Sequence, residues 1–299
     1  MALNVNDITG YVEEQRLPLI KKTVVGGDTI AKINLQTGVK GSAALNILNT
    51  AVVLQDGSNC GWNEEGTSEM TQRVLKTSPI AVNMSFCDKK LLDTWANYDV
   101  KVAAGQKELP FAEDFIEGVV KQVIGANEKL IWQGDATNGS GNLALFDGFL
   151  TILAGEASVI TDTLSGATVS DCINAAYDAI PSNIITKASI FVGQDMFKTY
   201  VQELTNANLY HYNPKVDGSF TVVMPGTEVA VYGVAGLNGT DKVVASDAEN
   251  LFVGVDLAGD DEKFEFWYSQ DNREFRLAIE YNMGVQVAFP DEVVVITKA

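Results

Sequence analysis

The chain has 299 residues, 46% of them hydrophobic, which is enough to bury one large core or two medium ones. It carries 21 basic and 39 acidic side chains, a formal net charge of −18, and such a surface repels nucleic-acid phosphate at long range. The acidic excess has two interpretations: ordinary solubility, or a surface that tolerates nearby DNA without binding it. Residues 1–22 lack the apolar core of a signal peptide, and no apolar run is long enough to span a membrane.

The three cysteines, Cys60, Cys87 and Cys172, are odd in number and widely spaced. Because no Cys-x-x-Cys pair occurs, the sequence argues against a zinc ribbon or a thioredoxin-like motif. We expect reduced thiols in a cytoplasmic chain.

Residues 1–45 show no clear hydrophobic period, although residues 7–20 are compatible with a short helix that residues 24–28 interrupt. The segment has one more basic than acidic side chain in an otherwise acidic chain. We expect an arm that lies on another surface rather than a core element. A frayed terminus is the alternative.

Residues 46–87 predict a long β-hairpin. Strand-type sequence stops at Asp56-Gly57, and it resumes from Met70 to Phe86, where apolar and polar residues alternate after Ile80. An isolated two-stranded hairpin is barely stable in water, so its outer part is expected to rest on another surface. Trp62 near the polar tip fits such a contact; the alternative is that it folds back on its own domain.

Residues 110–133 predict one long helix of about 33 Å that lies on a sheet. Its apolar residues recur at helical spacing, and Pro110 and Gly134 suit its start and its end. Gly118 and Gly125 lie on nearly one face, and each costs about 1 kcal/mol relative to alanine inside a helix. Two explanations stay open: close backbone packing against a sheet, or a helix that bends.

Residues 160–255 alternate between helical and strand patterns, as in a compact α/β subdomain. Helices are expected at 170–180 and 195–204, and strands at 189–193, 228–234, 242–245 and 250–255. From residue 263 the pattern is strongly β, with turns expected at 270–272 and 282–284. The apolar run 293–296 predicts an interior strand.

Motifs for catalysis or metal binding are missing from the sequence. His211 is the only histidine, no Gly-x-Ser-x-Gly elbow accompanies it, and neither phosphate-binding nor dinucleotide-binding glycine loops occur. The acidic residues Asp256, Asp260, Asp261 and Glu262 lack EF-hand spacing, so they predict a solvated turn, with a Ca²⁺ site as the alternative. We expect no enzyme, no cofactor and no metal.

The order of these parts resembles the major capsid protein of tailed bacteriophages, the Hong Kong 97-type capsid fold. Local sequence agrees: residues 109–115 leading to 129–135 look like the spine helix and the loop after it, and Phe146-Asp147-Gly148-Phe149 resembles the segment that follows. Residues 250–254 and 281–293 resemble the closing strands. The likeness covers most of the chain and rests on order and spacing rather than on single residues.

The resemblance implies an α+β fold with four parts. Residues 1–45 form the N-terminal arm and residues 46–87 the extended loop, a β-hairpin. Residues 88–155 and 256–299 form the peripheral domain, in which the spine helix 110–133 lies on a β-sheet. Residues 156–255 form an α/β axial domain. The resemblance also implies a structural subunit that self-assembles, as pentamers and hexamers, into an icosahedral head enclosing double-stranded DNA.

The expected inter-subunit contacts at the extended loop tip are Trp62, Glu64, Glu65, Met70 and Arg73, and the expected bend of the spine helix is at Gly118 and Gly125. Expected partners are the portal and, where present, scaffolding or decoration proteins, with no membrane and no sequence-specific DNA contact. A separate scaffolding protein, or none, is expected, and the location is the virion after assembly in the bacterial cytoplasm. The alternatives are an encapsulin-like compartment shell, a hydrolase-type enzyme, and a tail-tube or decoration protein.

Overall fold

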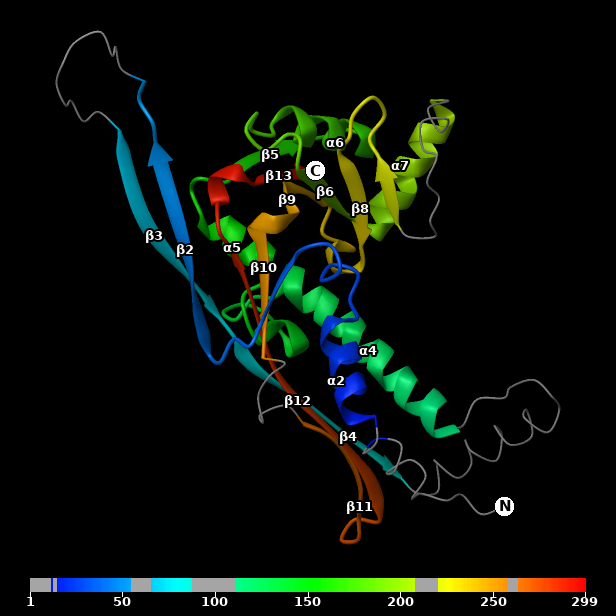
Figure 1. Cartoon of the computed structure of the whole chain (residues 1–299). Coiled ribbons are helices and arrows are strands. Elements are labelled where there is room, and N and C mark those ends of the chain that lie inside the picture. The colour runs from blue at the N-terminus through cyan, green and yellow to red at the C-terminus, as the bar shows by residue number, and fades with distance from the viewer. Residues whose placement is uncertain (1–11, 13–14, 55–65, 88–110, 208–219, 257–262) are drawn as a thin grey trace.

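The computed structural model describes residue 12 and residues 15–54, 66–87, 111–207, 220–256 and 263–299 (Figure 1). Its helices are α2 (Arg16–Val25), α4 (Phe111–Gln133), α5 (Phe149–Gly155), α6 (Val169–Asp178) and α7 (Gln194–Asn206), with short 3-10 turns η1 (Gly141–Ala144), η3 (Ala235–Leu237), η4 (Ala248–Asn250) and η5 (Pro290–Glu292). Its strands are β1 (Asn34–Thr37), β2 (Ser42–Ala51), β3 (Thr67–Lys76), β4 (Ser78–Cys87), β5 (Ile160–Leu164), β6 (Ala188–Gly193), β7 (Thr221–Val223), β8 (Ala230–Val234), β9 (Lys242–Asp247), β10 (Leu251–Val255), β11 (Lys263–Ser269), β12 (Glu274–Val287) and β13 (Val294–Lys298).

These strands form two sheets and a separate hairpin. The five-stranded sheet has the order β1-β10-β12-β11, with β4 also paired to β12, and the six-stranded sheet has the order β5-β13-β9-β6-β8-β7. Strands β2 and β3 pair only with each other. Figure 1 shows the hairpin projecting to one side, while β4, β12 and β11 project together in another direction as what we call the three-stranded ribbon.

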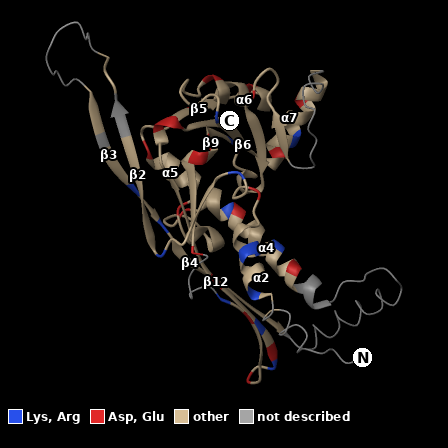
Figure 2. Ribbon diagram, viewed as in Figure 1, with Lys and Arg blue, Asp and Glu red and all other residues tan. Residues whose placement is uncertain are grey.

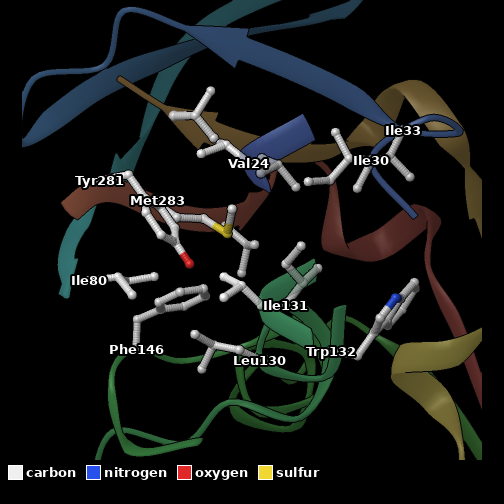
Figure 3. Close-up of a cluster of buried hydrophobic side chains, with 14 of the residues drawn as sticks. Val24, Ile30, Ile33, Ile80, Leu130, Ile131, Trp132, Phe146, Tyr281 and Met283 are labelled. Atoms are coloured by element: carbon white, nitrogen blue, oxygen red, sulfur yellow. The ribbon is translucent and has the colours of Figure 1, made fainter. Parts of the chain in front are cut away.

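The main core lies between α4 and the five-stranded sheet. The helix runs from Phe111 to Gln133, as predicted for the spine helix, and its inner face buries Ile116, Val120 and Ile131. Figure 3 shows Leu130 and Ile131 of α4 facing Ile80, Tyr281 and Met283 of the sheet, with Phe146 beside them. The helix ends at Gly134, where a Cβ would lie only 2.3 Å from the Phe146 carbonyl oxygen, so only glycine fits.

The N-terminal segment is part of this core, contrary to the prediction that residues 1–45 lie outside it. Helix α2 packs along α4 and buries Leu19, Ile20 and Val24, and Ile30 and Ile33 follow into the same cluster. Figure 3 places Val24, Ile30 and Ile33 on the side of α4 away from Phe146. The short apolar run of α2 gives a weak helical period, which explains why the sequence alone suggested a loose arm.

A second core fills the six-stranded sheet and the helices on it, as expected for an α/β unit. Strand β6 is buried at every position, and α6 and α7 cover the sheet through residues such as Ile173 and Tyr200. A capping box starts α6: the Thr168 hydroxyl accepts the Asp171 backbone N–H, and the Asp171 carboxylate accepts the Thr168 N–H. The predicted strands and helices of this region are confirmed to within a few residues.

Three strands belong to sheets other than the expected ones. Residues 78–87 lie in the five-stranded sheet as β4, so the hairpin comprises residues 42–76 rather than 46–87. Strand β10 (Leu251–Val255) joins the five-stranded sheet, and β13 (Val294–Lys298) joins the six-stranded sheet between β5 and β9. The strands themselves were predicted correctly. The alternation of apolar and polar residues shows which side of a strand is buried, but it does not show which strand pairs with it.

The turn predicted at residues 282–284 is wrong, because β12 is one continuous strand of 14 residues. Gly284 pairs with Gly254 on β10, and a Cβ at Gly284 would lie 1.9 Å from the Lys76 carbonyl oxygen. Glycine therefore allows the end of β3 to cross close over β12, a role that glycine often has inside a strand.

Candidate inter-subunit surface

The β2–β3 hairpin is a ten-residue antiparallel ladder in which Ala43 pairs with Leu75, Leu48 with Met70 and Ala51 with Thr67. Each strand spans about 33 Å at the usual rise. Among the described residues, β3 contacts β12 and β10 at the end of the hairpin near Leu75. Most of the hairpin's length therefore extends away from both cores (Figure 1).

The outer half of the hairpin exposes large apolar side chains. Leu48 and Met70 are a cross-strand pair on one face, and they are 62% and 77% exposed. Beyond β2, Val52 and Leu54 are 76% and 94% exposed. Figure 2 draws the described outer parts of these strands in tan, while Glu69 of β3 lies in a part whose side chains are not described. Several large apolar side chains exposed on one projecting element mark an interaction site, because leaving them in water is unfavourable.

The root of the hairpin has a small core of its own. Leu75 is fully buried, and it packs with Val39 and Leu45 in a cluster separate from the two larger cores. A Cβ at Gly254 would lie 2.8 Å from Leu75 Cδ2, so this glycine makes room for the leucine. Two open grooves of about 650 Å³ and 560 Å³ flank the root, one beside Arg73 and Phe146 and the other beside Ile47 and Phe252.

Two polar contacts set the direction of the hairpin relative to the body. Arg73 forms an ion pair with Glu156, the residue that ends α5. Gln286 Nε2 of β12 donates to the Val74 carbonyl oxygen at 2.9 Å. Arg73, which the sequence suggested as a contact to a neighbour, is thus bound within its own chain.

The other predicted contact residues divide into two groups. Met70 is exposed as a contact residue must be. Trp62, Glu64 and Glu65 lie outside the described residues, so their role stays a prediction. Leu48 lies inside the predicted hairpin, but sequence reasoning did not single it out, because its exposed pairing with Met70 is visible only in the structure.

Gly118 and Gly125 lie on the exposed face of α4. A Cβ at either position would meet no atom within 4 Å, so close packing against a sheet of this chain does not explain them. The alternative, a bend of the helix at these two residues, stays a prediction.

The residues considered for chemistry are scattered. In the part of the chain that the structure describes, no three His, Cys, Asp or Glu side chains gather as a metal site. Asp256 is buried and neither carboxylate oxygen has a hydrogen-bond partner among the described residues, while Asp260, Asp261 and Glu262 lie outside them. His211 and Cys60 also lie outside. Cys172 is buried in the second core, and burial raises the pKa of its thiol, which makes the thiolate scarce.

Among the described residues, no helix is both long and apolar enough to cross a bilayer.

No family model and no curated protein sequence matches this chain. Solved structures do resemble it. A chain of the satellite phage P4 procapsid including size determination (Sid) protein superposes with a TM-score of 0.64 at 12% identity, covering 98% of this chain and 97% of that one. A structure from Gordonia phage Cozz gives 0.59 at 14% identity, covering 91% and 86%. A virus-like particle from Pyrococcus furiosus gives 0.52 at 10% identity, covering 94% and 98%.

At these identities the likeness establishes the fold. The chain has the Hong Kong 97-type capsid fold that its sequence suggested, with a long spine helix on a β-sheet, an extended hairpin and an α/β unit.

Proposed function

We propose that the chain is the major capsid protein of a tailed bacteriophage, a structural subunit that assembles in many copies, as pentamers and hexamers, into an icosahedral head around double-stranded DNA. The observation that carries this proposal is the apolar hairpin, exposed in a chain with a capsid fold. A two-stranded hairpin with exposed leucine and methionine side chains is only marginally stable by itself, and a neighbouring copy of the chain would cover these side chains.

The hairpin's contacts with a neighbour then divide by position. Leu48 and Met70 supply the apolar contact, and Trp62, Glu64 and Glu65 extend it at the tip. Arg73 has a different role, because its ion pair with Glu156 holds the hairpin at a fixed angle to the rest of its own chain. Burial of the apolar residues on assembly then stabilises the hairpin by mass action.

The remaining partners follow from the same proposal. Portal protein, and scaffolding or decoration proteins where present, would contact the shell of this chain. The net charge of −18 agrees with DNA that is confined by the shell and not bound through sequence-specific contacts. The location would be the virion, after assembly in the bacterial cytoplasm. A structural role, rather than a catalytic one, agrees with the capsid folds that the chain resembles.

Electron microscopy of the purified full-length chain tests the proposal. Closed shells or hexagonal arrays support it, whereas a monodisperse monomer at high concentration contradicts it. The variant Leu48→Asp/Met70→Asp should prevent shells. Its matched control is Asn46→Asp/Gln72→Asp, which places the same charges on the next cross-strand pair of the same face, already polar, where Gln72 Nε2 donates to Asn46 Oδ1 at 2.8 Å.

A second candidate is an encapsulin-like compartment shell that encloses proteins. The observation behind this candidate is the likeness to the virus-like particle from Pyrococcus furiosus, whose TM-score of 0.52 is lower than the 0.64 and 0.59 of the two phage structures. The contents of particles isolated from the native host distinguish the two. Nuclease-protected double-stranded DNA supports the phage head, and a packaged protein without DNA supports the compartment.

A further inference from the structure

The N-terminal segment lies along the spine helix and is attached to it at both ends. In the last turn of α2, Lys22 Nζ lies 2.8 Å from Glu117 Oε1 of α4, in an ion pair at the surface. In the middle, Asn127 Nδ2 donates to the Thr23 carbonyl oxygen at 3.4 Å, and the Tyr281 hydroxyl donates to Asn127 Oδ1 at 2.6 Å. Val24 and Ile30, which follow these attachments in sequence, pack into the core beside α4 (Figure 3).

The far end is fastened by a buried polar group. Glu128 of α4 is 3% exposed, and its two carboxylate oxygens accept from the backbone N–H of Thr29 at 2.8 Å and from the Thr29 hydroxyl at 2.5 Å. The same hydroxyl accepts Trp132 Nε1–H at 2.9 Å. Thr29 is thus held by two residues one turn apart on α4.

Two glycines make room for this junction. A Cβ on Gly27 would lie 2.1 Å from Glu128 Oε1, and a Cβ on Gly236 of η3 would lie 2.2 Å from the Glu128 carbonyl oxygen. Three segments that are distant in sequence therefore meet at Glu128, with Gly27 against its carboxylate and Gly236 against its backbone carbonyl. Burial raises the pKa of Glu128, the Thr29 hydrogen bonds oppose that shift, and Asp28 adds to it. A buried carboxylate of this kind is costly, so its hydrogen bonds to Thr29 matter more than ordinary ones.

The attachment points lie on both sides of the two exposed glycines of α4. Glu117 precedes Gly118, and Glu128 and Trp132 follow Gly125, so the attached stretch spans about 22 Å of helix. A helix that is attached to a second element at both ends cannot bend between them unless one attachment opens. The two glycines on the exposed face of α4, which favour bending, and the N-terminal segment on its packed face, which opposes bending, thus affect the same part of the helix.

We propose that residues 16–33 are a splint that holds the spine helix straight, and that the Glu128–Thr29 junction is its latch. With the latch closed, α4 keeps its present course. With the latch open, the helix bends at Gly118 and Gly125. This device belongs to the single chain and goes beyond its proposed role in a shell.

Hydrogen–deuterium exchange of the full-length chain tests the latch through Thr29→Val, which removes the hydroxyl and keeps the shape. The expected result is exchange at least tenfold faster in residues 16–33 and also in α4 between Gly118 and Glu128, with the six-stranded sheet unchanged. The matched control is Thr23→Val. Thr23 is equally buried in the same segment, but its hydroxyl donates to Leu19 O of its own helix at 2.8 Å, so exchange in α4 should stay as in the parent.

Adding Gly118→Ala and Gly125→Ala to Thr29→Val should return α4 to slow exchange while residues 16–33 stay fast. Fast exchange confined to residues 16–33 in Thr29→Val would show a docked tail and not a splint. Equal acceleration over the whole chain, or none, would overturn the latch. If Thr29→Val does not fold, Trp132→Phe takes its place with the same expected pattern, because it removes the indole N–H that the Thr29 hydroxyl accepts, together with part of a buried ring. All these exchange rates are measured on the chain itself, so the test does not depend on whether the chain forms shells.

Discussion

The hairpin and the three-stranded ribbon are both long antiparallel structures that project from the body, but only the ribbon is completed by its own chain. On β12, Phe275, Leu277 and Tyr281 are each 1–2% exposed, whereas Leu48 and Met70 of the hairpin are mostly exposed. The ribbon rests on α2 and α4, and the hairpin rests on its small root cluster. Long antiparallel pairing by itself thus does not give a stable structure, because stability also needs a surface that covers the apolar face.

The largest expected difference between the two regions is in the free energy of unfolding. Leu277→Ala removes a fully buried side chain that lies between Met84 and Phe266, so it should destabilise the subunit by about 2–5 kcal/mol. Leu48→Ala removes an exposed leucine and should change stability by less than about 0.5 kcal/mol. Urea unfolding of the two variants measures both values, and equal losses would remove the distinction between the regions.

Assembly should show the opposite order of effects. Leu48→Asp/Met70→Asp should reduce the yield of closed particles more than tenfold while the unfolding free energy stays within about 1 kcal/mol, since both side chains are already in water. Deletion of residues 57–69 should have the same result. Size-exclusion chromatography with electron microscopy gives the yield. Normal particles from either variant would show that the outer hairpin is dispensable.

The spine helix offers a smaller effect that separates subunit stability from shell geometry. Gly118→Ala and Gly125→Ala should each stabilise the subunit by about 0.4–1 kcal/mol, because a Cβ at either position meets open space. If α4 must bend in a shell, the double variant should yield flat sheets or aberrant particles. Thermal unfolding measures the first effect and microscopy the second. Normal particles would show that the bend is not needed.

The smallest expected effect is a pH dependence at Glu128. Because burial raises its pKa above the ordinary value of 4.5, the folded chain takes up this proton more readily than the unfolded chain. That contribution to stability is fully present below the unfolded pKa and is lost as the pH rises through the folded pKa. Glu128→Gln should remove this slope, so its stability should fall less than that of the parent between pH 4.5 and the folded pKa. Parallel pH curves of the two proteins would show that Glu128 does not titrate there.

The sequence predicted those elements whose own hydrophobic pattern shows which face is buried. Helix 111–133 has a continuous apolar stripe, and β12 alternates over Phe275 to Tyr281, so both were visible before the structure. The partner of each strand could not be predicted, because β4, β10 and β13 each pair with a strand more than a hundred residues away in sequence. The sequence suggests a turn at Gly284, because the actual need for glycine there, the nearby Lys76 carbonyl oxygen, is a tertiary contact.

The candidate surface was predictable in outline only. Met70 was identified from its place in the hairpin, and Leu48 was missed. Arg73 was assigned to a neighbour because its ion-pair partner, Glu156, lies 83 residues away. The Glu128 junction carries no sequence signal, because a glutamate on a helix is ordinarily solvated and the segment that covers this carboxylate, Gly27 to Thr29, is about a hundred residues away in sequence.

Hydrogen exchange of the hairpin before and after assembly tests the central claim most directly. Amides of β2 and β3 beyond the root should exchange freely in the isolated subunit and become at least a hundredfold slower in the shell, while amides of β12 are already slow and change little. If the outer hairpin is as protected in the isolated subunit as β12, or gains no protection in the assembled state, then sister copies do not complete it and the account is wrong.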